Sequence, residues 1–196
     1  MTTKKWTLAV SALLFLVSPG CGGLRYSEVS PDAWNFHPRR IAVLPADTKV
    51  FSGAKGDIDR LFAEVLNEKK WFDAVIGGEV LSRRMESDET LRQVITDYMA
   101  KRSRLTFSDP VLSAKLGELT DAEAFLLVRV DYWNYATEKN KKIAKVSLTI
   151  EMTEAATGKV LWMAAHQRIS DYIIIKPDLP DVARALIREM IGYMPH

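Results

Sequence analysis

The feature that most constrains the fold is a strict alternation of apolar and polar side chains over residues 144–153. The apolar positions are Ala144, Val146, Leu148, Ile150 and Met152, and the polar ones are Lys145, Ser147, Thr149, Glu151 and Thr153. A period of two residues predicts a β-strand with one face on a core and the other in water, as is usual in antiparallel sheets. The chain must therefore build an antiparallel sheet that is covered on one face.

Neighbouring segments supply partners for this strand. Residues 125–135 form a long apolar and aromatic run, and the polar stretch 137–142 predicts the hairpin connection between the two. Thr157-Gly158 predicts a turn in which the glycine adopts a positive φ, and residues 159–169 return as the next strand. Together these segments predict an antiparallel meander.

The region before the meander has the pattern of a β-α-β unit. Residues 39–45 are a short apolar run ended by proline, and residues 71–76 are a second run, closed by Gly77-Gly78. Between them Asp57 is expected to cap a helix. Its apolar residues recur at helical spacing: Ile58, Leu61, Phe62, Val65 and Leu66. A helix between two buried strands favours a parallel pair.

Further helices are expected before and after the meander along the chain. Residues 80–85 predict a short helix, residues 91–99 carry an apolar stripe, and Asp109-Pro110 starts a helix towards Leu119. Asp178 is expected to cap a C-terminal helix with one apolar face. We therefore predict an α/β (α+β) fold, with a single three-layer-like domain and a mixed sheet of about five strands. The sheet has a β-α-β start, an antiparallel C-terminal meander and a C-terminal helix packed against it.

The N-terminal residues have the pattern of an export signal. Lys4-Lys5 precede an apolar run over residues 6–17, whose helical length of about 18 Å is too short for a hydrocarbon core of roughly 30 Å. Gly20-Cys21 resembles the lipobox of bacterial lipoproteins, which implies that Cys21 receives diacylglycerol and becomes the new N-terminus. By the same resemblance Gly22, which is not aspartate, favours the outer membrane. The alternative is an ordinary secretory signal that ends near a free thiol.

This interpretation divides the chain into three parts. They are a lipoprotein signal peptide over residues 1–20, a lipid-anchored linker over 21–38 and a periplasmic α/β domain over 39–196. Cys21 is the one cysteine of the sequence, which excludes a disulfide framework. The formal net charge is +2, from 27 basic and 25 acidic residues, and no block of like charges occurs. Nucleic-acid binding is therefore not expected.

No catalytic or metal-binding pattern emerges from the sequence. His37, His166 and His196 lack metal-ligand spacing. The loop 52–57 lies between a strand and a helix, but it lacks the residue order of a phosphate-binding loop. Carboxylates such as Asp57 are expected to lie at helix starts and on solvated faces. We therefore expect no enzyme activity, no catalytic residues, no cofactor and no metal.

Two apolar segments each have a structural and a functional interpretation. Trp133 and Tyr135, at alternate positions, are expected to share one face, where they either pack under a helix or contact a protein partner. Residues 172–175 are either structural, as an edge strand, or a docking segment.

The order of the predicted elements and the sequences of several short segments resemble one group of bacterial lipoproteins. The segments are Arg40-Ile41-Ala42-Val43-Leu44-Pro45, Phe72-Asp73-Ala74-Val75-Ile76, Leu116-Gly117, Asp121-Ala122-Glu123-Ala124-Phe125-Leu126-Leu127-Val128 and Ala156-Thr157-Gly158-Lys159-Val160-Leu161-Trp162. They resemble periplasmic domains related to the curli-secretion lipoprotein (CsgG-like) and to the lipoprotein activators of penicillin-binding proteins (LpoB-like), which share a TolB-N-like α/β fold. The resemblance covers about residues 39–194.

The resemblance implies a non-enzymatic protein that works by contact or assembly. The expected partner is an envelope protein, either a cell-wall synthase or part of a secretion assembly. The alternative is a homo-oligomeric structural component of an envelope or secretion complex. Pore-forming members insert hairpins whose strands need about 9 to 11 alternating residues, and the alternating runs of this chain are needed for its core. A secretion pore is therefore not expected.

Overall fold

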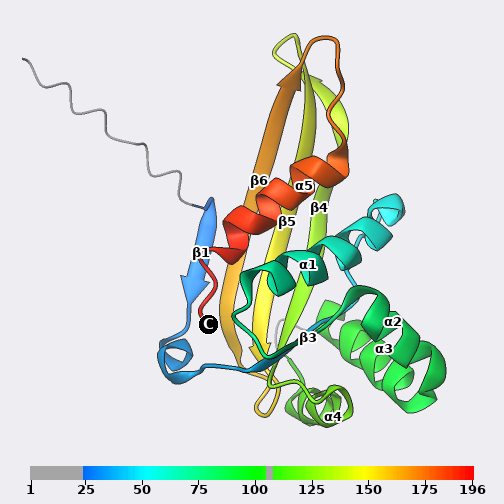
Figure 1. Cartoon of the computed structure of the whole chain (residues 1–196), viewed down its shortest axis with the longest axis vertical. Helices are drawn as coiled ribbons and strands as arrows, with labels where there is room; N and C mark the ends of the chain where they lie inside the picture. Colours follow the sequence, from blue (N-terminus) through cyan, green and yellow to red (C-terminus); the bar gives the residue numbers. More distant parts are fainter. Residues whose placement is uncertain (1–23, 105–107) are drawn as a thin grey trace, which may run out of the picture.

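A computed structural model describes residues 24–104 and 108–196. Their strands form one mixed sheet of six strands in the order β1-β6-β5-β4-β2-β3, with helices on both faces (Figure 1). The strands are β1 (Tyr26–Val29), β2 (Arg40–Val43), β3 (Ala74–Ile76), β4 (Ala124–Glu138), β5 (Lys141–Glu154) and β6 (Val160–Tyr172). The predicted α/β (α+β) fold is confirmed, with six strands in place of the expected five or so.

Both predicted parts of the sheet are present. β2 pairs in parallel with β3 and with β4, and β4, β5 and β6 form the antiparallel meander. Gly158 adopts the expected positive φ, 70°, in the turn between β5 and β6. The connection between β4 and β5 is shorter than the predicted 137–142, because the strands continue to a two-residue turn at Lys139 and Asn140. Both turn residues have positive φ, which matches the twist of a tight hairpin.

The sixth strand comes from the segment that the sequence analysis assigned to a linker. β1 pairs antiparallel with residues 162–165 of β6, and all four of its residues are exposed. The Trp162 indole N–H donates to Ser27 Oγ at 3.1 Å, and the Ser30 amide donates to the Leu161 carbonyl at 2.8 Å. A 3-10 helix, η1 (Pro31–Asn35), follows. This strand is fixed to the sheet by hydrogen bonds and buries none of its side chains. The sequence therefore has no apolar pattern that would predict it.

One layer of helices lies on each face of the sheet (Figure 1). α1 (Lys55–Lys69) and α5 (Leu179–Ile191) share one core with the sheet. α2 (Gly78–Ser87), α3 (Glu89–Arg104) and α4 (Pro110–Thr120) share a second core on the other face. The three-layer prediction is therefore confirmed.

The predicted helix starts are confirmed to different degrees. Asp109 accepts hydrogen bonds from the amides of Val111 and Leu112, which confirms it as the N-cap of α4. The Lys101 ammonium and the Leu112 amide hold the pKa of Asp109 below its ordinary value. Asp178 occupies the N-cap position of α5, but its side chain makes no capping hydrogen bond.

The prediction that Asp57 caps α1 is wrong. A short 3-10 helix, η2 (Ser52–Ala54), runs directly into α1, so that Asp57 lies inside its first turn. There the Asp57 carboxylate accepts a hydrogen bond from Arg60 at 3.2 Å. A carboxylate in the first turn is still favourable, since it faces the positive end of the helix dipole.

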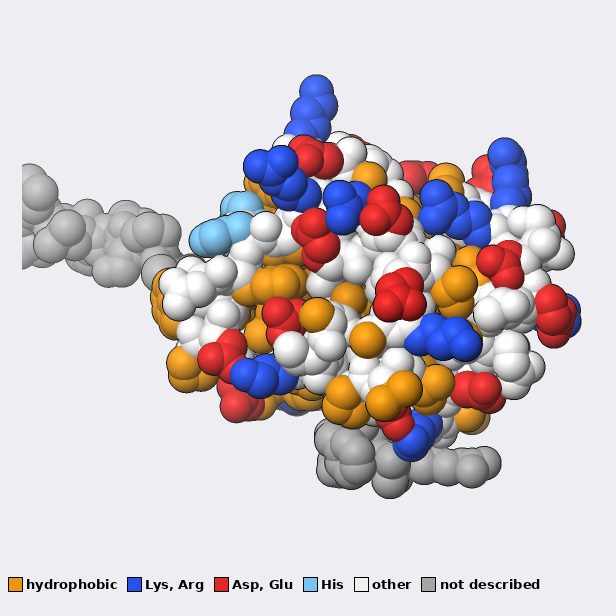
Figure 2. All heavy atoms as spheres, turned by 90° about the horizontal axis from the view of Figure 1, so that it is seen from below, with side chains coloured by type: hydrophobic (Ala, Val, Ile, Leu, Met, Phe, Trp, Pro, Cys, Tyr) orange, Lys and Arg blue, Asp and Glu red, His pale blue; other side chains and the backbone are white. Residues whose placement is uncertain are grey.

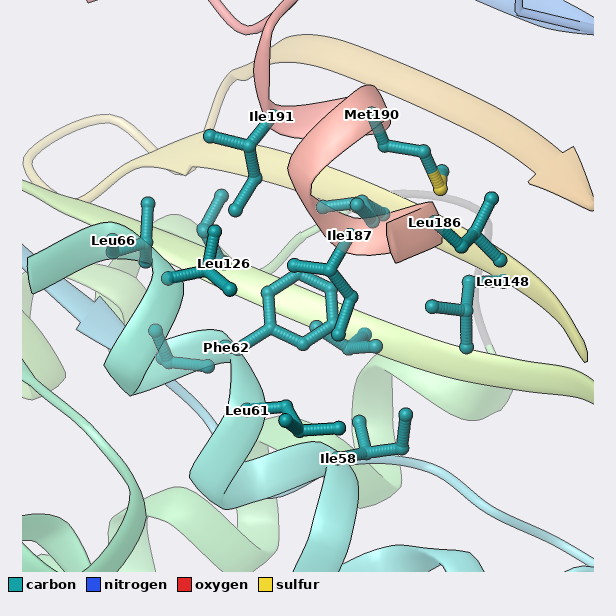
Figure 3. Packing of buried hydrophobic residues seen from close by; sticks show 14 of the residues in the cluster. Ile58, Leu61, Phe62, Leu66, Leu126, Leu148, Leu186, Ile187, Met190 and Ile191 are labelled. Atoms are coloured by element: carbon teal, nitrogen blue, oxygen red, sulfur yellow. The ribbon is translucent and has the colours of Figure 1, made fainter. Parts of the chain in front are cut away.

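The larger core lies between α1, α5 and the meander (Figure 3). The Phe62 ring of α1 lies at its centre, beside Ile187 of α5 and Leu126 of β4, and all three side chains are fully buried. At the outer surface Arg188 of α5 donates to Glu68 of α1 at 2.8 Å. The two helices therefore contact each other as well as the sheet.

A buried ion pair joins α3 to the second face of the sheet. The Nε atom of Arg102 donates to Oε1 of Glu151 in β5 at 3.0 Å, and a second hydrogen bond joins Nη2 to Oε2. The two side chains are 16% and 10% exposed. Nearby, the Tyr98 hydroxyl lies 2.9 Å from Ser108 Oγ, and burial raises the pKa of Tyr98. α3 thus has both apolar and polar contacts to the sheet.

Replacing Phe62 by alanine is expected to lower the free energy of unfolding by about 3–5 kcal/mol, because the ring is fully buried between three elements. Urea unfolding followed by circular dichroism measures the change. Val111→Ala is the matched control, since Val111 lies on α4 and is 77% exposed, and it should change the value by less than about 0.5 kcal/mol. Equal effects of the two variants would contradict the packing described here.

Arg102→Met is expected to destabilise the protein by about 3 kcal/mol, because the Glu151 carboxylate would stay buried without its counter-charge. The double variant Arg102→Met/Glu151→Leu removes both charges and should recover most of that loss. Urea unfolding of the parent, both single variants and the double variant measures the coupling. A double variant as unstable as Arg102→Met would show that the unpaired Glu151 carboxylate is not the cause of the loss.

Candidate interaction surfaces

The predicted lipidation site, Cys21, lies outside the described residues, so its acylation stays a prediction. The first described residues are fixed against β6. The Arg25 amide donates to Nδ1 of His166 at 3.1 Å, and the Arg25 guanidinium donates to Oε1 of Gln167 at 2.6 Å. Because β1 is antiparallel to β6, the N-terminal end of β1 points towards the end of the sheet where β6 terminates (Figure 1).

A β-bulge places Trp133 and Tyr135 on the inner face of β4. The register between β4 and β5 shifts between Val130 and Tyr132, which leaves Asp131 as the extra residue. Before the bulge Val130 faces the larger core, and after it Trp133 and Tyr135 pack against the same core, both half-buried. Contact of these two residues with a protein partner stays a prediction, and their packing favours the structural alternative.

The Tyr135 side chain holds both ends of the segment that joins β6 to α5. Its hydroxyl donates to the Pro177 carbonyl at 2.9 Å, and the Lys176 ammonium lies 3.4 Å from its ring centroid. The Tyr172 ring meets it edge-on, with 6.1 Å between centroids. Partial burial, and then the negative charge of Asp178, raise the pKa of Tyr135. The sequence does not reveal this arrangement, because it depends on the bulge four residues earlier.

Between the two ends of this segment lie three consecutive isoleucines, here called the isoleucine tip (Ile173, Ile174 and Ile175). Their side chains are 89%, 89% and 85% exposed. Of the two predictions for residues 172–175, the edge strand is wrong beyond Tyr172, where β6 ends. The docking interpretation stays open for the isoleucine tip.

A groove of about 570 Å³ opens between α3 and the second face of the sheet. Several polar side chains in and beside the groove contact one another: Arg129 Nε donates to Asp131 Oδ1 at 2.7 Å, and Thr149 Oγ1 donates to Asp131 Oδ2 at 2.6 Å. The Arg102–Glu151 pair lies in the same groove.

The three histidines contact neighbouring residues, and the loop 52–57 forms η2 and the first turn of α1. His196 stacks on Trp71 with 3.8 Å between ring centroids, and Nδ1 of His37 lies 3.2 Å from the His196 carbonyl. His166 lies beside Glu189, with 3.4 Å between Nε2 and Oε1. Within residues 24–104 and 108–196, no group of three or more His, Cys, Asp or Glu side chains could hold a metal ion.

The end of the molecule that carries α4 mixes both signs of charge. Figure 2 views this end and shows acidic and basic side chains interspersed with apolar ones. Such a surface offers no single-sign field to attract a charged partner. Among the helices that the structure describes, none is long and apolar enough to cross a membrane.

Comparison with known proteins identifies similar folds. No family model matches the sequence, and no curated protein matches it either. Among solved structures, the PelC dodecamer from Paraburkholderia phytofirmans is 16% identical, with a TM-score of 0.55, over 85% of this chain and 93% of that one. Lipoprotein GNA1162 from Neisseria meningitidis is 17% identical, with a TM-score of 0.50, over 80% of this chain and 100% of that one.

A third similar structure is the hypothetical protein CT253 from Chlamydia trachomatis. It is 9% identical, with a TM-score of 0.51, over 78% of this chain and 93% of that one. At these identities the likeness establishes a shared fold, and it extends over most of each compared chain. The chain therefore has a fold that is found in a bacterial lipoprotein and in a protein that assembles as a dodecamer.

Proposed function

We propose that this chain is a non-enzymatic outer-membrane lipoprotein whose periplasmic domain binds another protein of the cell envelope. The observation that carries the proposal is the fold shared with lipoprotein GNA1162, in a chain whose one cysteine follows a short apolar segment. Acylation of that cysteine, Cys21, with diacylglycerol and palmitate would hold the domain at the membrane. Each buried CH₂ group of an acyl chain contributes about 0.8 kcal/mol to that attachment.

Attachment supplies the mechanism of the proposed function. A domain confined to one membrane surface meets a partner at a higher effective concentration than the same domain free in the periplasm. The partner classes, a cell-wall synthase or a secretion assembly, follow from the resemblance to CsgG-like and LpoB-like domains.

A second candidate function is a homo-oligomeric structural component of an envelope complex. The specific observation in its favour is that two similar structures are PelC dodecamers, 16% identical to this chain, with TM-scores of 0.55 and 0.52. In this alternative, copies of the chain contact each other in place of a different envelope protein.

Replacing Cys21 by alanine is expected to remove the protein from the outer-membrane fraction and to abolish incorporation of labelled palmitate, because the acylated thiol is lost. Density-gradient fractionation of cells that express the full chain measures the distribution. Gly23→Ala is the matched control and should leave it unchanged. An outer-membrane protein that persists after Cys21→Ala would refute the anchor.

Crosslinking in living cells through a tagged full chain distinguishes the two functions. If the chain binds an envelope partner, mass spectrometry of the captured species should identify one distinct envelope protein. Light scattering of the purified lipidated protein in detergent should then give the mass of a single copy. A ladder of self-crosslinked species, together with a multiple of that mass, would instead support the homo-oligomer.

A further inference from the structure

The isoleucine tip is a run of three consecutive apolar side chains, each at least 85% exposed. Full burial of one isoleucine typically contributes about 1.5–3 kcal/mol, so exposing three in a row forgoes several kcal/mol of stabilisation. Isolated apolar side chains on a surface need no explanation, but a contiguous group indicates a contact. The tip lies at the end of the sheet where β6 terminates, beside the β4–β5 turn (Figure 1).

The contacts of the neighbouring residues hold the tip outwards. Tyr135 contacts Tyr172 before the tip, and it contacts Lys176 and Pro177 after it. Lys141 of the adjacent hairpin pairs with Asp171 at 3.1 Å. The ends of the segment are therefore fixed to the sheet while the three isoleucines between them face solvent.

The charges around the tip are mainly basic. Lys139, Lys142 and Lys176 are exposed beside it, while Lys141 pairs with Asp171 and Glu138 of the hairpin pairs with Lys145. Lysines at the edge of an apolar patch suit the phosphate level of a bilayer, where the stem lies in the apolar region and the ammonium meets the headgroups. The cores of protein interfaces are instead rich in aromatic residues and arginine, whereas the centre of this patch consists of three aliphatic side chains. The chemistry of the patch therefore favours lipid over a protein partner.

The geometry of the chain start agrees with this assignment. Tyr26 pairs with Ala165, and β6 continues for seven residues to Tyr172, which corresponds to about 23 Å. The five residues from Tyr26 back to Cys21 span at most about 17 Å in the same direction. A fully extended chain could thus bring an acylated Cys21 to within about 6 Å of the level of Tyr172, at the base of the tip.

We propose that the isoleucine tip inserts into the same lipid leaflet that holds the acyl chains of Cys21, so that the domain contacts the membrane at two points. The part of this inference that concerns a shared leaflet rests on the proposed lipid anchor. Two contacts fix the tilt of the domain, which one flexible acyl anchor does not. The sheet would stand on the membrane with α4 at the far end (Figure 1).

A fluorescent label at Ile174 tests the proposal. In the lipidated full chain the thiol of Ile174→Cys is free while Cys21 is blocked, so the environment-sensitive dye NBD attaches at the tip. In vesicles of phosphatidylethanolamine and phosphatidylglycerol we expect a blue-shifted emission. Lipids with a nitroxide on the acyl chain should quench it at least roughly twofold, which places the dye at the depth of the chains.

Val111→Cys, on the exposed side of α4, is the matched control, and its label should keep the emission of water without acyl-chain quenching. Tip emission equal to that of the control would overturn the proposal. A blue shift that grows with protein concentration and resists the nitroxide lipids would also overturn it, since a second copy of the chain would then cover the tip.

The intact mass of each sample keeps the two proposals separate. An acylated protein whose tip label is not quenched refutes insertion and leaves the anchor intact. An unacylated protein refutes the anchor. In that case the same label on a Cys21→Ala background still measures the depth of the tip in vesicles, because the dye reports insertion at residue 174 rather than attachment of the chain.

Discussion

The difference in length between the strands and the helices that cover them determines the architecture. β4 has 15 residues and spans about 50 Å, whereas α5 has 13 residues and spans about 20 Å. The helices therefore cover the middle of one face and the lower part of the other, where the two cores lie (Figure 1). The upper end of the meander projects beyond both helical layers. The isoleucine tip lies at this projecting end because α5 begins only after the chain has returned to the sheet.

Sequence patterns predict the parts of this fold that bury a periodic apolar face. The alternation in β5 predicts the meander, and the apolar stripe of α5 predicts its covering helix. The β-α-β pattern of residues 39–78 predicts the parallel strands that make the sheet mixed. β1 was not predicted, because its four residues are exposed and therefore show no apolar pattern. Main-chain hydrogen bonds and the contact of Trp162 with Ser27 hold it to the sheet. The prediction for Asp57 was wrong because aspartate is favourable both at the N-cap and in the first turn of a helix. The role of Tyr135 depends on a change of register, and no local pattern marks it.

Among the described residues, every buried side-chain nitrogen and oxygen has a hydrogen-bond partner, whereas three consecutive isoleucines are exposed. In and beside the groove next to α3, Arg102 pairs with Glu151 and Arg129 with Asp131. Tyr135 occupies the border between this rigid interior and the exposed segment, with its ring half-buried and its hydroxyl bonded to Pro177. One side chain therefore joins the packed core to the exposed isoleucines.

The bulge at Asp131 also restricts how the hairpin can change in length. Side chains alternate between the two faces, so a deletion or insertion of one residue between the bulge and the turn would move every later side chain of β4 to the opposite face. Trp133 and Tyr135 would then leave the core, and the segment before α5 would lose its contact to the sheet. A change of two residues in each strand keeps the faces intact. Without a further bulge, the projecting end of this fold can therefore grow or shrink only in even steps, which sets discrete heights for whatever it carries.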